Sequence, residues 1–394
     1  MASLCKISLV ILSFLALSCS KENNPVDSTQ GDYKYTVPTQ TNDGWKTASL
    51  TEVGLNVEPL EDMVNMLNNT EGHQIHNILI IKNSKLVFEK YFQALSYSIS
   101  PPSNGTSMVT YTGDMIHYLA SQSKSVTSIL FGIAIQEGFI SENLDEKIVT
   151  YFPDYDEILT GEKRNITVKH LLTMTSGLNF DETTYPYGDL RNDVTRLFNE
   201  SDPIRFVLSK SMHATPGTIF FYNSGVTNVL ADIIRKKSGL NLIEFAKQYL
   251  FQPLDITKYS WQKMRGEYYF ASGGLSLRPR DMAKIGYLFL NQGQWDGQQI
   301  INPEWLEASK QNYINPNVGW ATGYGFQWWL NSVVADETTI NYVLAAGYGE
   351  QLMFIVPALD LLIVFNCGYF DAPFTVSPYQ LIDDYIAPAL FDGQ

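Results

Sequence analysis

One segment of this 394-residue sequence, residues 118–139 (YLASQSKSVTSILFGIAIQEGF), limits the possible folds more than any other. It predicts a helix that is apolar on nearly all faces, and such a helix must be buried among other elements. The helix would nevertheless begin with three serines and Lys124. An ammonium group is unfavourable near the positive N-terminal end of a helix dipole. The fold must therefore bury this helix, and some other interaction must hold Lys124 at its start.

The segments around this helix indicate an α+β fold. Alternating and apolar runs bounded by turns predict two pairs of strands, 78–81 with 86–92 and 351–356 with 361–365. A helix is predicted after them, over residues 378–390. Strands at both ends with helices between them favour an antiparallel sheet rather than alternating βαβ units. The composition, 45% hydrophobic residues, is sufficient for one large core.

Three helices are predicted between the strand pairs. Thr167 can cap a short helix that Gly177 would stop. The apolar spacing over residues 226–234 predicts an amphipathic helix that ends before Gly239. Asp281 can cap a third helix, which Gly293 would end.

The N-terminal residues read as an export signal rather than as part of the fold. Lys6 precedes an uncharged run over residues 7–17, which is too short to span a bilayer, and LALSC resembles a bacterial lipobox with Cys19 as the lipidated residue. The alternative is ordinary signal cleavage nearby. We expect three parts: 1–18, a lipoprotein signal peptide; 19–50, a flexible tether rich in Asn, Thr, Asp, Ser and Gln; and 51–394, the folded domain.

This interpretation predicts a lipoprotein of the bacterial cell envelope, anchored to a membrane at the periplasmic or cell-surface face. The chain has three cysteines, so loss of Cys5 with the signal and lipidation of Cys19 would leave Cys367 without a partner. The net charge of −14 argues against nucleic acid as a partner. We expect no cofactor and no metal, because the sequence has no HExxH, CxxC or carboxylate-rich loop and its five histidines are scattered.

The spacing of Ser121 and Lys124 indicates a candidate catalytic pair. Positions i and i+3 share a helix face, so the Lys124 amine could reach the Ser121 hydroxyl. A serine becomes a nucleophile when a base takes its proton, and burial can lower a lysine pKa enough for that role. The Ser121 N–H would also lie where an oxyanion needs a donor. The alternative is that Ser121 only caps the helix.

Two further stretches could complete such a site. In PGTIFFYNSG, Tyr222 could carry a proton as its phenolate, with Ser224 beside it; alternatively, Tyr222 is an aromatic core residue. In LAAGYGEQLMFIV, Gly347 would let a strand edge approach a substrate and the Tyr348 N–H could be a second oxyanion donor; alternatively, the glycines form a plain turn.

Together these stretches resemble the serine β-lactamase-like superfamily, in the branch of class C β-lactamases, D-aminopeptidases, esterases and 6-aminohexanoate-dimer hydrolases. ITVKHLLTMTSGL, ASGGLSLRPRDMAKIGYLFLNQGQWDG and YGFQWWL are also similar to that family. The resemblance implies an antiparallel β-sheet flanked by helices with an inserted all-helical lobe. It also implies that Ser121 is the acylated nucleophile, Lys124 its base and Tyr222 the partner acid/base.

Departures from the family pattern bear on the substrate. Ala345 stands where β-lactamases carry a lysine that helps to recognise a carboxylate, and Tyr222-Asn223-Ser224 replaces Tyr-x-Asn. We therefore expect a serine hydrolase of esters or short amides through a Ser121 acyl-enzyme. The alternatives are a D-amino-acid peptidase or β-lactamase acting on cell-wall-type substrates, and a non-catalytic binding protein on the same scaffold. The tyrosine-rich segments 183–189 and 266–270 either line the cleft or pack the core.

Overall fold

The computed structural model describes residues 32–335, 338–370 and 372–391. The helices are α1 Glu58–Asn68, α2 Gln122–Gln136, α3 Val168–Leu172, α4 Asp193–Asn199, α5 Pro203–Ser209, α6 Ser224–Ser238, α7 Leu242–Ala246, α8 Pro279–Leu290, α9 Pro303–Ser309, α10 Pro378–Leu381 and α11 Ala387–Phe391. The strands are β1 Ile75–Lys82, β2 Lys85–Tyr91, β3 Gln93–Ile99, β4 Pro102–Thr110, β5 His117–Tyr118, β6 Tyr259–Trp261, β7 Leu275–Leu277, β8 Gln294–Trp295, β9 Gln298–Gln299, β10 Gly323–Tyr324, β11 Trp329–Ala335, β12 Thr338–Gly347, β13 Gln351–Val356 and β14 Leu361–Cys367.

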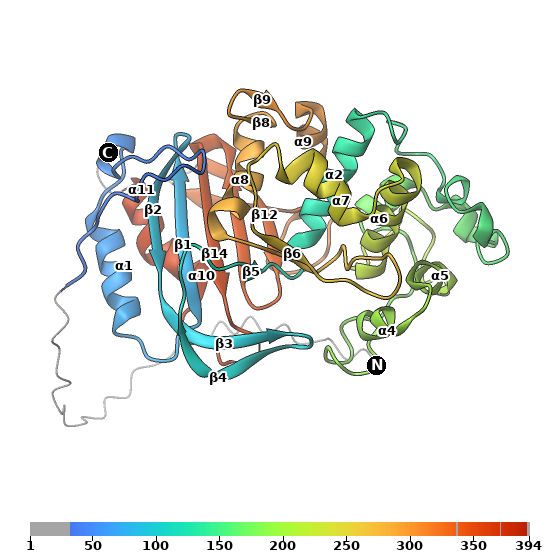
Figure 1. Ribbon diagram of the computed structural model, residues 1–394, viewed down its shortest axis with the longest axis horizontal. Helices are drawn as coiled ribbons and strands as arrows, with labels where there is room; N and C mark the ends of the chain where they lie inside the picture. Colours follow the sequence, from blue (N-terminus) through green and yellow to red (C-terminus); the bar gives the residue numbers. More distant parts are fainter. Residues whose placement is uncertain (1–31, 336–337, 371, 392–394) are drawn as a thin grey trace.

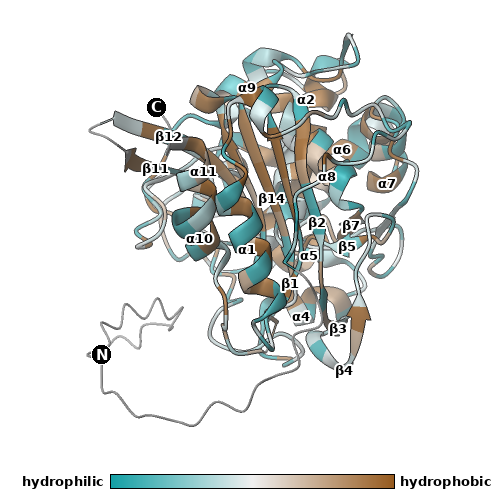
Figure 2. Cartoon of the chain, turned by 90° about the vertical axis from the view of Figure 1, so that its left-hand side faces the viewer, coloured by the Kyte–Doolittle hydropathy of each residue, from teal (hydrophilic) through white to brown (hydrophobic). Residues whose placement is uncertain are grey.

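A seven-stranded antiparallel sheet forms the centre of the molecule, in the order β10-β11-β12-β13-β14-β1-β2. The N-terminal hairpin β1–β2 and the C-terminal strands meet where β1 pairs with β14, with Ile78 opposite Phe365. Helices α1, α10 and α11 cover one face of this sheet, with their more hydrophilic sides outward (Figure 2). The other face carries α8 and α2, and the helical lobe with α4 to α7 lies beyond them (Figure 1). The α+β class, both predicted strand pairs and the helical lobe are thus confirmed.

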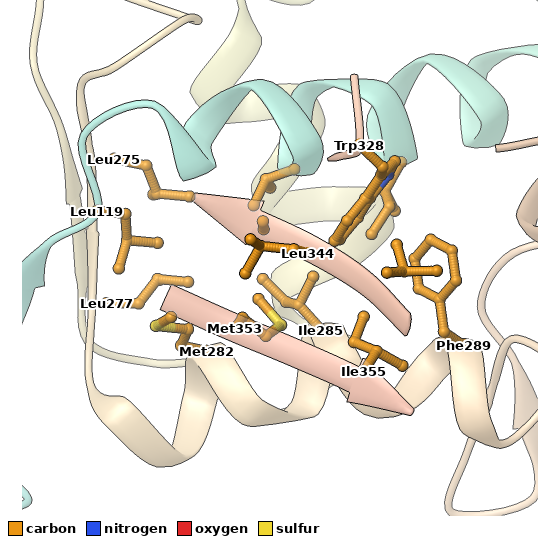
Figure 3. Close-up of a cluster of buried hydrophobic side chains, with 14 of the residues drawn as sticks. Leu119, Leu275, Leu277, Met282, Ile285, Phe289, Trp328, Leu344, Met353 and Ile355 are labelled. Atoms are coloured by element: carbon orange, nitrogen blue, oxygen red, sulfur yellow. The ribbon is translucent and has the colours of Figure 1, made fainter. Parts of the chain in front are cut away.

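The main core layer lies between the sheet and the helices α2 and α8. Met353 of β13 faces Met282 and Ile285 of α8 in this layer, and all three side chains are buried (Figure 3). Leu119, just before α2, joins the same cluster. Helix α2, which the sequence predicted to be buried, therefore packs between the sheet and other helices.

Two predicted helix ends differ from the structure. α3 ends at Leu172, well before Gly177, because Met174 takes a left-handed backbone conformation with φ of 57°. α8 starts at Pro279, so Asp281 lies in its first turn and does not cap it. The Asp281 carboxylate instead pairs with Arg278 at 2.7 Å and with Lys284 at 3.4 Å.

The prediction of a flexible tether over residues 19–50 is wrong for the part that the structure describes. From residue 32 onward this segment packs on the domain, and the Tyr33 N–H donates to Asn65 Oδ1 at 2.7 Å. Trp45 is only 2% exposed, lies 5.0 Å from the Trp295 ring and donates its indole N–H to the Arg280 carbonyl. Residues 19–31, like the signal segment 1–18, lie outside the described residues. The segment is polar in composition, but burial of the single Trp45 side chain is enough to hold it against the domain.

No helix within the described ranges is long and apolar enough to cross a membrane.

The packing of Trp45 predicts that the N-terminal segment stabilises the domain. Trp45→Ala should lower the free energy of unfolding by about 3–5 kcal/mol, because it leaves a cavity beside the Tyr287 and Trp295 rings. Chemical denaturation followed by circular dichroism would measure this. Val37→Ala, at a position that is 46% exposed in the same segment, is the matched control and should change little. A loss below about 1 kcal/mol for Trp45→Ala would show that the segment is only loosely attached.

Candidate active site

Ser121 lies immediately before α2, at the junction between β5 and the helix. It occupies the N-cap position, but its side chain makes no capping hydrogen bond. The preceding Ala120 has φ of 46°, an uncommon conformation for a residue with a Cβ. The interpretation of Ser121 as a simple helix cap is therefore contradicted. Its hydroxyl is free for another partner.

That partner is Lys124, which is buried and only 2% exposed. Its Nζ lies 2.9 Å from Ser121 Oγ and donates at 2.8 Å to the carbonyl oxygen of Ser272. The Tyr222 ring centroid lies 4.8 Å from the same nitrogen. The i, i+3 spacing read from the sequence thus brings serine and lysine into direct contact, with the predicted tyrosine beside them.

Burial gives the Lys124 amine an unusual acidity. Desolvation lowers its pKa to about 8, although the nearby carboxyl of Glu182 acts in the opposite direction. With that pKa, roughly a tenth of the amine is neutral at pH 7. A neutral amine in contact with a serine hydroxyl can accept its proton.

Tyr222 lies two residues before the start of α6, which Asn223 caps through a 3.2 Å hydrogen bond from the Val226 N–H. Its ring stacks on Trp329, with centroids 5.7 Å apart. Desolvation raises the Tyr222 pKa well above its ordinary value, and a hydrogen bond with Ser121 only partly offsets this. Tyr222 is thus a neutral phenol that can donate a hydrogen bond, whereas the sequence analysis expected a phenolate.

The end of β12 closes the site on the side of the sheet. A Cβ added to Gly347 would lie 2.2 Å from the Leu119 carbonyl oxygen, so only glycine permits this approach. Gln122 of α2 donates to the Ala345 carbonyl at 3.1 Å and fixes the register between strand and helix. Ser224 and Tyr348 line the same pocket as Ser121. Every predicted site residue except Cys19, which lies outside the described residues, is therefore at or next to this pocket.

Glu182 is a residue of this site that the sequence analysis missed. It is 5% exposed, and its Oε2 accepts a 3.3 Å hydrogen bond from the Ser224 N–H. Its other carboxylate oxygen has no hydrogen-bond partner among the described residues. Burial raises the Glu182 pKa, and the charge of Lys124 acts against this. The only available signal was an acidic residue immediately before the tyrosine-rich segment 183–189.

Asn228 was also missed, because its role depends on tertiary structure. From α6 its Nδ2 donates at 3.0 Å to Ser272 Oγ, and its Oδ1 accepts from the Ala271 N–H at 3.0 Å. These bonds hold the Ser272 carbonyl in position against Lys124. We regard Asn228 as a positioning residue for the amine.

The tyrosine-rich segments divide between the two expected roles. Tyr187 and Phe270 line the pocket. Tyr268 instead packs against Arg235, whose Cζ lies 5.4 Å from the centroid of the Tyr268 ring.

Within the described residues, no group of three or more His, Cys, Asp or Glu side chains could hold a metal ion. His170 caps α3.

Comparisons with known proteins find a matching family model and several relatives. A family model described as Beta-lactamase matches residues 72–374. The 6-aminohexanoate-dimer hydrolase of Paenarthrobacter ureafaciens is 25% identical over 273 residues, which cover 64% of this chain and 66% of that enzyme. Protein flp of Staphylococcus aureus is 24% identical over 188 residues, 48% of this chain and 34% of its own length. The chain thus spans less than two thirds of these relatives.

A solved structure supports the fold assignment independently. The crystal structure of a family VIII carboxylesterase superimposes with a TM-score of 0.63, covering 84% of this chain and 96% of that one at 14% identity. At this identity the likeness concerns the fold alone.

The Lys124–Glu182 pair predicts a pH-dependent nucleophile. The neutral amine is the form that accepts a proton, so the reactivity of Ser121 should rise with pH through about 8. The negative charge of Glu182 raises the Lys124 pKa, so Glu182→Gln should move this rise to lower pH. The rate of Ser121 modification by an alkyl fluorophosphonate, measured from pH 5 to 10, gives both profiles.

Glu137→Gln is the matched control for this prediction. It removes the same charge just past the far end of α2, roughly 20 Å from Lys124 at 1.5 Å per residue, and should leave the profile unchanged. A shift to higher pH in Glu182→Gln would contradict the proposed coupling.

Proposed function

Because the chain belongs to the Beta-lactamase family, a family of serine hydrolases whose model spans residues 72–374, we propose that it cleaves an ester or short amide through an acyl-enzyme on Ser121. The observation that carries this proposal is the 2.9 Å contact between Ser121 Oγ and a buried lysine whose pKa is lowered to about 8. Both groups of a nucleophile–base pair are thus within hydrogen-bond reach.

Acylation would begin with proton transfer from Ser121 to neutral Lys124. The Ser121 oxygen attacks the substrate carbonyl carbon, and the carbonyl oxygen becomes an oxyanion. The hydrogen bond from Lys124 to the Ser272 carbonyl keeps the amine aimed at the hydroxyl. This orientation lowers the entropic part of the barrier.

The oxyanion would be bound by two backbone N–H groups. One belongs to Ser121, at the start of α2, where the helix dipole also favours negative charge. The other belongs to Tyr348, which follows Gly347 at the end of β12. The close approach of Gly347 to the Leu119 carbonyl supports this arrangement, because it brings the strand end next to the nucleophile.

Collapse of the intermediate would require a proton for the leaving group. Lys124, now an ammonium, supplies it, and the neutral Tyr222 phenol relays it or stabilises the leaving oxygen or nitrogen by donating a hydrogen bond. Water then attacks the acyl-enzyme, with the same lysine as base. Ser121 regains its proton and the acid is released.

The surroundings of Ala345 favour esters and short amides over β-lactams and cell-wall peptides. Ala345 is fully buried, and its position provides no cation for a substrate carboxylate. An enzyme that uses a charged contact to recognise such a group cannot lose it without a large loss of affinity. One relative, named a 6-aminohexanoate-dimer hydrolase, supports a linear amide rather than a β-lactam as the bond that is cleaved.

For localisation we propose the envelope lipoprotein described above, with Cys19 as the anchored residue. The support is the sequence alone: LALSC follows the apolar run of residues 7–17. The described domain would then be held at a membrane surface by its N-terminal segment.

The nucleophile assignment predicts that Ser121→Ala lowers the turnover of p-nitrophenyl butyrate by roughly 10⁴-fold or more. Lys124→Met should cause a comparable loss, because it keeps the side-chain length and removes the base. Ser128→Ala is the matched control, since this serine lies in the same helix and its hydroxyl has no hydrogen-bond partner among the described residues. Full turnover by Ser121→Ala would refute the proposed mechanism.

The lipid-anchor proposal predicts that Cys19→Ser releases the protein from the membrane fraction. Fractionation of cells that express both forms would measure this, with Cys367→Ser as the control. Continued membrane association of the Cys19→Ser protein would rule out Cys19 as the anchor.

A further inference from the structure

The pocket that opens from Ser121 has a volume of about 290 Å³ and carries no charge. Its lining side chains are aromatic, aliphatic, hydroxyl or amide groups, and none is Asp, Glu, Lys, Arg or His. Both charged groups of the site, Lys124 and Glu182, are absent from that lining. A ligand in this pocket therefore meets no counter-ion there.

One wall of the pocket is the tip of the β3–β4 hairpin. Ile99, Pro101 and Pro102 form this wall, and the hairpin runs below the central sheet toward α4 (Figure 1). The Tyr97 hydroxyl accepts a 3.1 Å hydrogen bond from the Tyr118 N–H, three residues ahead of Ser121. The hairpin is thus anchored to β5, the strand that precedes the nucleophile.

A second wall comes from α4 and the loop before it. Phe198 and Val194 of α4 line the pocket with Tyr187. The Gly188 N–H donates at 2.9 Å to Thr195 Oγ1, so the Thr195 hydroxyl already has a partner within the wall. This wall therefore offers mainly apolar surface to a ligand.

From this lining we infer that the substrate is uncharged and seats an apolar group between the β3–β4 tip and α4. The inference rests on the proposed function and narrows its substrate class. A charged group entering this pocket would lose its hydration without gaining an ion pair, which is costly. The net charge of −14 further disfavours an anionic substrate through long-range repulsion.

The test uses matched esters that differ in one terminal charge. On the acyl side these are p-nitrophenyl hexanoate, p-nitrophenyl 6-aminohexanoate and mono-p-nitrophenyl adipate. On the alcohol side they are butyl and 4-aminobutyl esters of hexanoic acid. In at least one of the two series, acyl or alcohol, we expect kcat/KM of the charged esters to be at least about 100-fold lower than that of the uncharged ester. Equal kcat/KM values within both series would overturn the inference.

Asn199→Lys then tests the location of the pocket. Asn199 lines the pocket at the C-terminal end of α4, where a cation is compatible with the helix dipole. If the charged acyl chain meets this wall, the variant should raise the adipate-to-hexanoate ratio of kcat/KM at least 10-fold. Asn199→Met, of similar size and uncharged, should not. If the first test finds the preference on the alcohol side, the anionic substrate is instead the hexanoate ester of 4-hydroxybutanoic acid, and butyl hexanoate is its uncharged reference. An unchanged ratio would overturn the assignment.

Binding to Ser121→Ala separates this inference from the proposed mechanism. Hexanamide should raise the melting temperature of this variant, while hexanoate and 6-aminohexanamide at the same concentration should not. Equal shifts from all three would overturn the inference even if Ser121 is the nucleophile. Conversely, turnover retained by Ser121→Ala together with selective hexanamide binding would refute the mechanism and leave the pocket assignment intact.

Discussion

The contact between the buried Lys124 amine and Ser121 is the interaction on which the rest of this structure depends. An ammonium group in a protein interior is costly unless polar partners surround it. Here the partners are the Ser121 hydroxyl and the Ser272 carbonyl, at 2.9 and 2.8 Å. Keeping them in place requires elements from distant parts of the sequence to converge on one helix end.

The other polar residues at the start of α2 explain how that convergence is achieved. Gln122, Ser123, Ser125 and Thr127 each form a hydrogen bond with a different partner: the Ala345 carbonyl, the Leu275 N–H, the Gln327 carbonyl and the Ala271 carbonyl, respectively. The serines thus do not face solvent as caps; their side chains form hydrogen bonds from one buried helix to the surrounding backbone. Each of these hydrogen bonds satisfies a buried polar group, which would otherwise destabilise the fold.

The sequence predicted those features that depend on local pattern. The strand pairs around residues 82–85 and 357–360 and the Ser121–Lys124 contact follow from turn residues and helical spacing, both of which are short-range. Trp45, Glu182 and Asn228 could not be predicted in this way. Trp45 lies in a polar segment, and the partners of Glu182 and Asn228 are more than 40 residues away. Asp281 was assigned to a cap because its residue type fits one, but Pro279 fixes the helix start two residues earlier.

The separation of charge between the two sides of Ser121 gives the site its chemical character. On one side, Lys124 and Glu182 form a buried pair whose pKa values move toward neutrality through burial. On the other side, the pocket walls contain no Asp, Glu, Lys, Arg or His side chain. A low local dielectric strengthens the hydrogen bonds to a developing oxyanion. The same environment penalises any charge that the substrate itself brings. On the proposed mechanism, a site that activates its nucleophile by desolvation would therefore also select for neutral substrates, so reactivity and specificity would share one physical cause.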